Sequence, residues 1–137
     1  ATDVAPRLNE GFAAQTFSVE TAPIDAVLAE HGIEQVDLVK MDIEGAEINA
    51  LRGMRGTIAR SPGLTLIMEY NPQALRAFDL DPVTALDEVL GMGFDRMRII
   101  EADGSLTDIT GDTAALDQLT ERLMRHMDVV NLMITKN

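Results

Sequence analysis

The stretch that most constrains the fold is residues 36–47, VDLVKMDIEGAE, in which an apolar run stops at a carboxylate. Asp42 ends the run, Glu44 follows two residues later, and Gly45 then begins a helical pattern. In a parallel α/β sheet such a junction lies at the carboxyl end of a strand, where ligands bind. A solvated corner would also carry an acid. Three acids within six residues, with Glu47 as the third, nevertheless favour a binding or catalytic site.

A second strand repeats this design. Residues 64–68 are an apolar run that leads directly into Glu69, and residues 46–60 between the two strands carry apolar positions on one helical stripe. Strand–helix–strand units of this kind cross over with a right hand. We therefore expect Asp42, Glu44 and Glu69 to lie at the same edge of the sheet.

Further helices and strands are predicted before and after this strand–helix–strand unit. Residues 16–20 alternate polar and apolar side chains, which predicts a half-exposed strand. Further patterns predict helices at 24–31, 81–91 and from 113, and strands at 97–100, 105–109 and 129–134. Because residues 36–41 are almost continuously apolar, we expect both faces of the sheet to be covered. The prediction is a single α/β domain over residues 15–137, with a mostly parallel central sheet and helices on both faces, after a loosely ordered leader at 1–14.

Composition excludes several classes of function. The formal charge of −12 argues against binding to nucleic acid or to anionic membrane surfaces, and no apolar run is long enough to span a bilayer. Cysteine is absent, which excludes disulfides, thiolate catalysis and thiolate zinc sites. We expect a small-molecule ligand, with no nucleic acid and no membrane as partners. The cytoplasm is the default expectation for the compartment.

These residues resemble a known family, the FkbM-type S-adenosylmethionine-dependent methyltransferases. The resemblance rests on residues 36–47, on LRG at 51–53 and on LIME at 66–69, which stands where the family has a hydrophobic strand ending in Glu. The pairs Ile-Asp at 24–25 and Asn-Leu at 131–132 support it. The resemblance covers roughly residues 16 to 135 and corresponds to the carboxy-terminal half of the Rossmann-like methyltransferase domain.

The resemblance implies S-adenosylmethionine as cofactor and O-methylation of a sugar or another small metabolite. It also implies that the last strand, at residues 129–134, inserts antiparallel into the sheet. In methyltransferases of this fold a glycine-rich loop after the first strand holds the methionine end of the cofactor. No strand followed by G-x-G precedes residue 36. We therefore expect this chain alone to be inactive.

Within this family interpretation, the strand-end residues receive roles. Asp42 is expected to accept a hydrogen bond from the cofactor or the methyl acceptor, Glu44 to act as a base, and Glu69 to position the acceptor. Tyr70 and Asn71 are expected to line the acceptor pocket, although loop capping is an equal expectation for Asn71. No residue is assigned as a metal ligand, while oxygen ligands of this kind would suit Mg²⁺.

For Glu47, in the first helical turn, we expect an interaction with the helix dipole rather than catalysis. Two alternatives to methyl transfer stay open. Asp42 and Glu44 also resemble the Asp-x-Asp pair of magnesium-dependent phosphohydrolases, in which the first acid attacks phosphorus. In the second alternative the chain is a non-catalytic, self-associating domain, because residues 36–41 would leave an apolar, unpaired strand edge. We then expect a homodimer through this edge, or an edge covered by the leader and residues 16–20.

Overall fold

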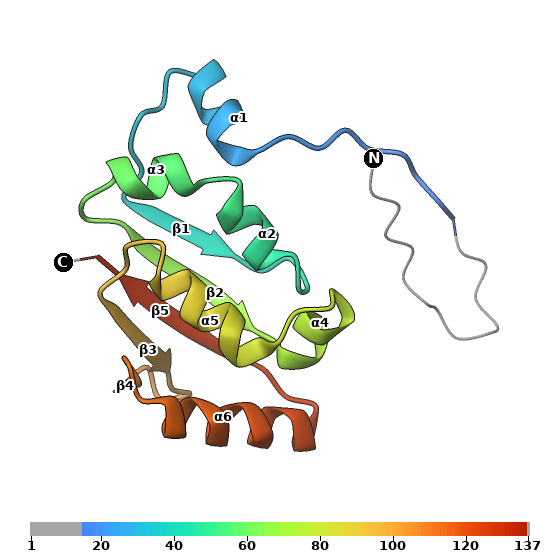
Figure 1. The fold of residues 1–137 in the computed structure, drawn as a ribbon, viewed down its shortest axis with the longest axis vertical. Coiled ribbons are helices and arrows are strands. Elements are labelled where there is room, and N and C mark those ends of the chain that lie inside the picture. The colour runs from blue at the N-terminus through green and yellow to red at the C-terminus, as the bar shows by residue number, and fades with distance from the viewer. Residues whose placement is uncertain (1–14, 137) are drawn as a thin grey trace.

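The computed structural model describes residues 15–136, so the predicted leader at 1–14 lies outside the described residues. Eleven helices and strands follow along this part of the chain (Figure 1). The helices are α1 (Ile24–Glu30), α2 (Glu47–Arg52), α3 (Arg55–Arg60), α4 (Pro72–Ala77), α5 (Pro82–Leu90) and α6 (Thr113–His126). The strands are β1 (Leu38–Met41), β2 (Thr65–Tyr70), β3 (Arg96–Ile100), β4 (Leu106–Asp108) and β5 (Val130–Thr135).

The five strands form one open, mixed sheet in the order β1-β2-β5-β3-β4. β1 and β2 are parallel, whereas the β2–β5, β5–β3 and β3–β4 pairs are antiparallel. The expected antiparallel insertion of the last strand is confirmed, because β5 lies between β2 and β3. The expectation of a mostly parallel sheet is wrong. The insertion of β5 makes its pairings with β2 and with β3 antiparallel, and the β3–β4 hairpin at Asp103-Gly104 adds a third antiparallel pair.

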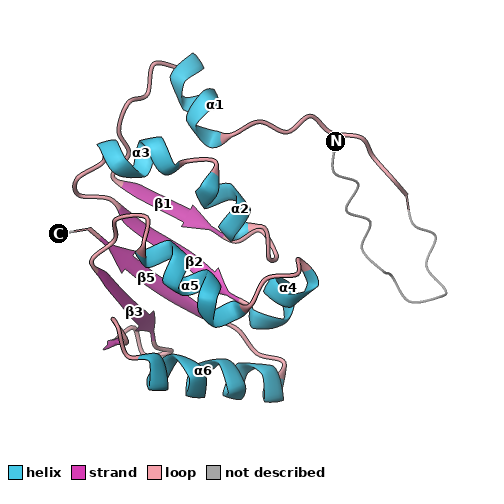
Figure 2. Cartoon of the chain, in the orientation of Figure 1, coloured by secondary structure: helices cyan, strands magenta, loops and turns pink. Residues whose placement is uncertain are grey.

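The helices cover one face of this sheet. Along β2, Leu66, Met68 and Tyr70 are fully buried, while the alternating residues are only partly buried. Figures 1 and 2 show helices on one side of the strands, and α4, α5 and α6 contact one another there. On the other face of β1, Leu38 is 61% exposed. The expectation of helices on both faces is therefore not met by residues 15–136, because the apolar run at 36–41 is buried on only one side.

The predicted helix at 46–60 is broken into α2 and α3. Met54, at the junction, has φ −125° and ψ 19°, which is not helical. A Cβ at Gly53 would lie 3.4 Å from Pro23 Cα, so the chain entering α1 passes close to the break. At Gly56 a Cβ would lie 2.9 Å from Asp25 Oδ2. Both glycines therefore permit the close approach of α1.

Asp25 of α1 acts as an N-cap for α3 from another part of the chain. Its carboxylate accepts hydrogen bonds from the backbone N–H groups of Gly56 and Thr57, at 2.8 and 2.7 Å, and from the Thr57 hydroxyl. Burial opposes ionisation of Asp25, but these bonds and the Arg60 charge outweigh it and hold the pKa of Asp25 below its ordinary value. The stripe predicted at 46–60 is confirmed, since Ile48 and Ile58 are fully buried.

The predicted strand at residues 16–20 is wrong. This segment is in no sheet, and its apolar residues Phe17 and Val19 are 73% and 77% exposed. An alternating pattern stabilises a strand only where a neighbouring strand completes its hydrogen bonds, and the described residues offer it none. Residues 16–20 therefore do not cover the outer edge of β1. None of the helices within residues 15–136 is long and apolar enough to cross a membrane.

Candidate functional site

Three carboxylates meet where β1 and β2 end. Asp42 and Glu44 lie in the loop after β1, and Glu69 is the penultimate residue of β2. One carboxylate oxygen from each lies within 4.8 Å of the other two. The convergence predicted from the right-handed crossover is therefore confirmed. We refer to Asp42, Glu44 and Glu69 as the carboxylate cluster.

The register of the two strands explains this convergence. Met41 pairs with Met68 in the parallel β1–β2 ladder, so Asp42, which follows Met41 out of β1, lies level with Glu69, which follows Met68 within β2. Glu69 lies on the sheet face that the helices leave open, because its neighbours Met68 and Tyr70 point into the core. The cluster is thus open to solvent, with Asp42 and Glu44 exposed and Glu69 half-buried.

The cluster is strongly anionic. Lys40 Nζ lies 3.6 Å from Asp42 Oδ2, and both side chains are about half exposed, with relative exposures of 52% and 54%. Burial raises the pKa of Glu69 above its ordinary value, and the charges of Asp42, Glu44 and Glu47 raise it further, while Lys40 partly opposes them. Such a carboxyl holds a proton more readily than an ordinary glutamate, so it can donate as well as accept a hydrogen bond with a hydroxyl group.

The loop between β1 and α2 has an unusual backbone. Glu44 has φ 56°, in the left-handed region that non-glycine residues seldom adopt, and Gly45 has φ 100°. A Cβ at Gly45 would lie 2.8 Å from Ala74 O and 2.9 Å from Ala74 C in α4. Only glycine fits this position without a shift of α4. The glycine of the sequence motif is thus explained by a close backbone contact with a distant helix.

The buried side chain of Glu47 is hydrogen-bonded to the backbone of this loop. It is 3% exposed, and its two carboxylate oxygens accept hydrogen bonds from the backbone N–H groups of Ile43 and Gly45, both at 2.9 Å. It is also the first residue of α2, as expected of an acid near a helix N-terminus. Its bonds to the loop were not apparent from sequence.

Tyr70 and Asn71 do not join the cluster. Tyr70 is fully buried on the helix-covered face, where its hydroxyl lies 2.7 Å from Thr120 Oγ1. Burial raises the pKa of Tyr70 to about 12. Tyr70 is therefore a core residue in this structure and not part of the site's lining. Asn71 caps α4, since its side-chain oxygen accepts from the Ala74 N–H at 3.1 Å, which confirms the capping expectation.

One residue of the site was missed as a candidate. Asn131 of β5 pairs directly with Glu69 of β2, so the two side chains share the open face next to the cluster. Asn131 is exposed and offers an amide that can donate and accept hydrogen bonds. The sequence singles out Asn131 only as part of the Asn-Leu pair of the family resemblance, because its place beside Glu69 depends on a pairing between residues far apart in the chain.

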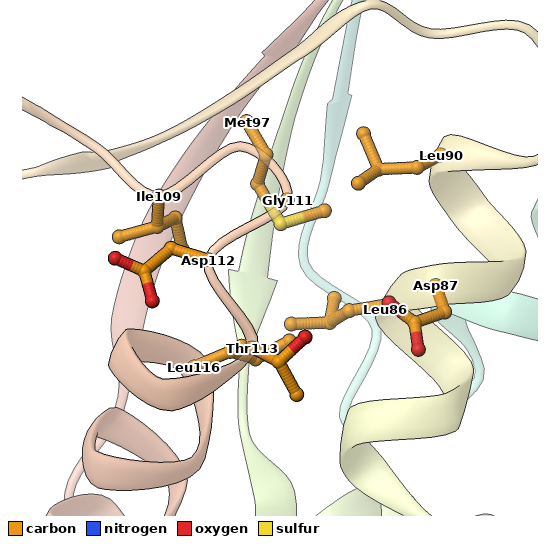
Figure 3. A pocket seen from close by; sticks show the side chains of 9 residues that line it. All are labelled: Leu86, Asp87, Leu90, Met97, Ile109, Gly111, Asp112, Thr113 and Leu116. Carbon is orange, nitrogen blue, oxygen red and sulfur yellow. The ribbon is translucent and has the colours of Figure 1, made fainter.

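A small pocket lies elsewhere, between α5, β3 and the start of α6 (Figure 3). Its volume is about 20 Å³, and none of the three clustered carboxylates lines it. Pockets for small molecules are typically about 300–1,000 Å³, whereas a water needs roughly 10–15 Å³. This pocket has room for water and not for a substrate or cofactor. The carboxylate cluster therefore stays the candidate site.

Comparison with known proteins places this sequence in a family. Residues 2–101 match the methyltransferase FkbM domain. The chain is also 34% identical over 74 residues to the 2-O-methyltransferase NoeI of Sinorhizobium fredii (strain NBRC 101917 / NGR234). That alignment covers 54% of this chain but only 29% of the relative, so the chain spans under a third of the protein it matches. No solved structure matches. Because the domain match covers most of the sequence, the chain belongs to the FkbM methyltransferase family.

Proposed function

We propose that this chain forms the acceptor-side part of an S-adenosylmethionine-dependent O-methyltransferase. The observation that carries the proposal is the carboxylate cluster at the carboxyl ends of two neighbouring parallel strands, in a chain of the FkbM family. We propose a sugar or another small hydroxylated metabolite as the methyl acceptor. Exposed carboxylates accept hydrogen bonds from hydroxyl groups, and a relative is named a 2-O-methyltransferase.

The three side chains of the carboxylate cluster suit different roles in methyl transfer. Glu44 is exposed and can receive the proton of an acceptor hydroxyl, while the half-buried Glu69 can orient that hydroxyl. The family implies S-adenosylmethionine, and a carboxylate such as Asp42 fits its ammonium and hydroxyl groups as a hydrogen-bond acceptor. When bound, this cofactor supplies a methyl group on a sulfonium for in-line displacement.

We further propose that the sheet is the second half of a Rossmann-like methyltransferase fold and that these 137 residues alone do not methylate. The parallel β1–β2 pair and the antiparallel β5 support the fold assignment. In the part of the chain that the structure describes, no strand leads through a glycine-rich loop into a helix, and the cluster is open to solvent. A cofactor of this size normally needs a site that buries most of its surface.

Calorimetric titration of the chain with S-adenosylmethionine and S-adenosylhomocysteine tests this proposal. We expect no tight, stoichiometric binding, and such binding would overturn the proposed inactivity. A parallel nitrogen–proton NMR titration should show weak shifts confined to the loop after Met41. The shifts should disappear in Asp42→Asn and persist in Asp37→Asn, which removes the same charge at the other end of β1. Shifts that survive Asp42→Asn would refute the role of Asp42.

The phosphohydrolase alternative makes a different prediction from the same residues. Three clustered carboxylate oxygens suit Mg²⁺, but membership of the FkbM family favours methyl transfer. Phosphatase activity with Mg²⁺ that is lost in Asp42→Asn and retained in Asp37→Asn would favour the hydrolase. We expect no such activity.

For a partner we propose a second copy of the chain, bound at the outer edge of β1. β1 pairs only with β2 within residues 15–136, and Leu38 at its start is 61% exposed. Unpaired strand edges bind other strands, and natural proteins protect them with charges such as lysine. Light scattering should show a dimer that Leu38→Lys converts to a monomer. A monomeric unmodified chain would contradict the proposal. The non-catalytic alternative gains support only if the titrations detect no ligand binding and the assays detect no activity. The cytoplasm remains the proposed compartment.

A further inference from the structure

Glu47 stands out among the acids of this region because it is buried and both of its carboxylate oxygens accept hydrogen bonds. Its exposure is 3%, whereas Asp42 and Glu44 are exposed. Each carboxylate oxygen accepts one backbone N–H at 2.9 Å, from Ile43 and from Gly45. These two donors flank Glu44, whose φ of 56° is unfavourable for a residue with a side chain.

We propose that Glu47 is a positioning residue that holds the Asp42–Glu44 turn in the conformation that brings both carboxylates to Glu69. The inference deepens the proposed function and rests on it only in taking the carboxylate cluster as the ligand site. Glu47 does not itself face a ligand at the cluster, because it is buried beneath the loop. It acts through the backbone of the two residues on either side of Glu44.

The geometry favours this role over a simple interaction with the helix dipole. An acid that serves the dipole of α2 needs no contact outside its own helix, and it is usually exposed. Glu47 instead satisfies two backbone donors of the preceding loop, which would otherwise lack partners next to a close helix contact at Gly45. Hydrogen bonds to an ionised group are stronger than neutral ones, so they can offset the backbone strain at Glu44.

Two variants separate positioning from charge. Glu47→Ala removes the charge and both acceptors, whereas Glu47→Gln removes the same charge but keeps one acceptor oxygen. Glu121→Gln, at an exposed position of α6, serves as the control for loss of an acid elsewhere. Urea unfolding of each variant gives its global stability. Only samples that are folded throughout are compared.

The first readout is amide hydrogen exchange. In Glu47→Ala we expect exchange at Ile43 and Gly45 to accelerate about tenfold or more, with a smaller change in Glu47→Gln and none in Glu121→Gln. The amide of Ile58 in α3, which donates to Met54 O at 2.9 Å, should keep its rate relative to global unfolding. Equal acceleration at Ile58 would mean general destabilisation and would overturn the proposal.

The second readout is the carbon NMR titration of the Glu69 carboxyl. Both Glu47 variants lose the same charge, so any difference between them reports the arrangement of Asp42 and Glu44 around Glu69. We expect the Glu69 pKa to be lower in Glu47→Ala than in Glu47→Gln. Identical titrations and identical exchange in the two variants would show that Glu47 acts by charge alone. Neither readout needs methyl transfer, so failure of the proposed function and failure of this inference are distinguishable.

Discussion

Replacement of Gly45 by alanine tests the architecture of the site most directly. The new Cβ would lie 2.8 Å from Ala74 O and 2.9 Å from Ala74 C, both backbone atoms of α4. It would also force an L-residue to adopt φ 100°. Backbone strain of this kind costs about 1–3 kcal/mol and overpacking about 1–3 kcal/mol, so we expect a loss of about 2–6 kcal/mol in the free energy of unfolding. This is a large part of the roughly 5–15 kcal/mol that stabilises an ordinary domain.

Two other glycines separate the contributions. Gly32 has φ 67°, but a Cβ added there would meet no atom within 4 Å, so Gly32→Ala should cost only the backbone strain, about 1–2 kcal/mol. Gly63 has neither a positive φ nor a close neighbour, and Gly63→Ala should change stability by less than about 1 kcal/mol. Urea unfolding followed by the helical circular dichroism signal measures all three. If Gly45→Ala costs no more than Gly32→Ala, the close contact between the loop and α4 is refuted.

Three further predictions concern single side chains. Asp25→Asn should lose about 1 kcal/mol at neutral pH, as expected for a weakened cap. Because the pKa of Asp25 is lowered by folding, the difference from the unmodified chain should shrink as acid titration passes below the ordinary aspartate pKa. Folding raises the pKa of Glu69, so ionisation of this residue destabilises the folded state, opposite to the effect at Asp25. At pH values above the ordinary glutamate pKa, Glu69→Gln should therefore raise the melting temperature, and at lower pH it should leave the melting temperature unchanged. Tyr70→Phe should cost about 0.5–1.5 kcal/mol in urea unfolding, since it removes the bond to Thr120, and an unchanged stability would contradict that bond.

Much of the site could be predicted because the positions of its residues follow from local sequence patterns. An apolar run that ends in a carboxylate marks a strand end, and the right-handed crossover then places the next strand beside it in parallel. These two rules were sufficient to bring Asp42, Glu44 and Glu69 together. Caps are local as well: Asp81 accepts from the Thr84 N–H at 2.9 Å at the start of α5, as its place before Pro82 indicates.

The incorrect predictions have two different causes. The strand at residues 16–20 had a suitable pattern but no partner strand among residues 15–136, and the helix at 46–60 is interrupted where α1 approaches at Gly53 and Gly56. Tyr70 was expected at the site because it follows Glu69, yet alternation along β2 turns it to the opposite face. The first two outcomes depend on segments that are distant in sequence, whereas the position of Tyr70 follows from the local alternation of β2 itself.

The sequence by itself determined the strand ends, the apolar stripes and the three acids of the cluster, because these follow from the backbone periodicity of neighbouring residues and from the hand of the crossover. Tertiary structure alone decided that Asn131 lies beside Glu69, that Ala74 packs against Gly45, and that the helices of residues 15–136 cover only one face of the sheet. Such contacts join segments whose separation along the chain carries no period, so they are set by packing and strand pairing and not by any local pattern.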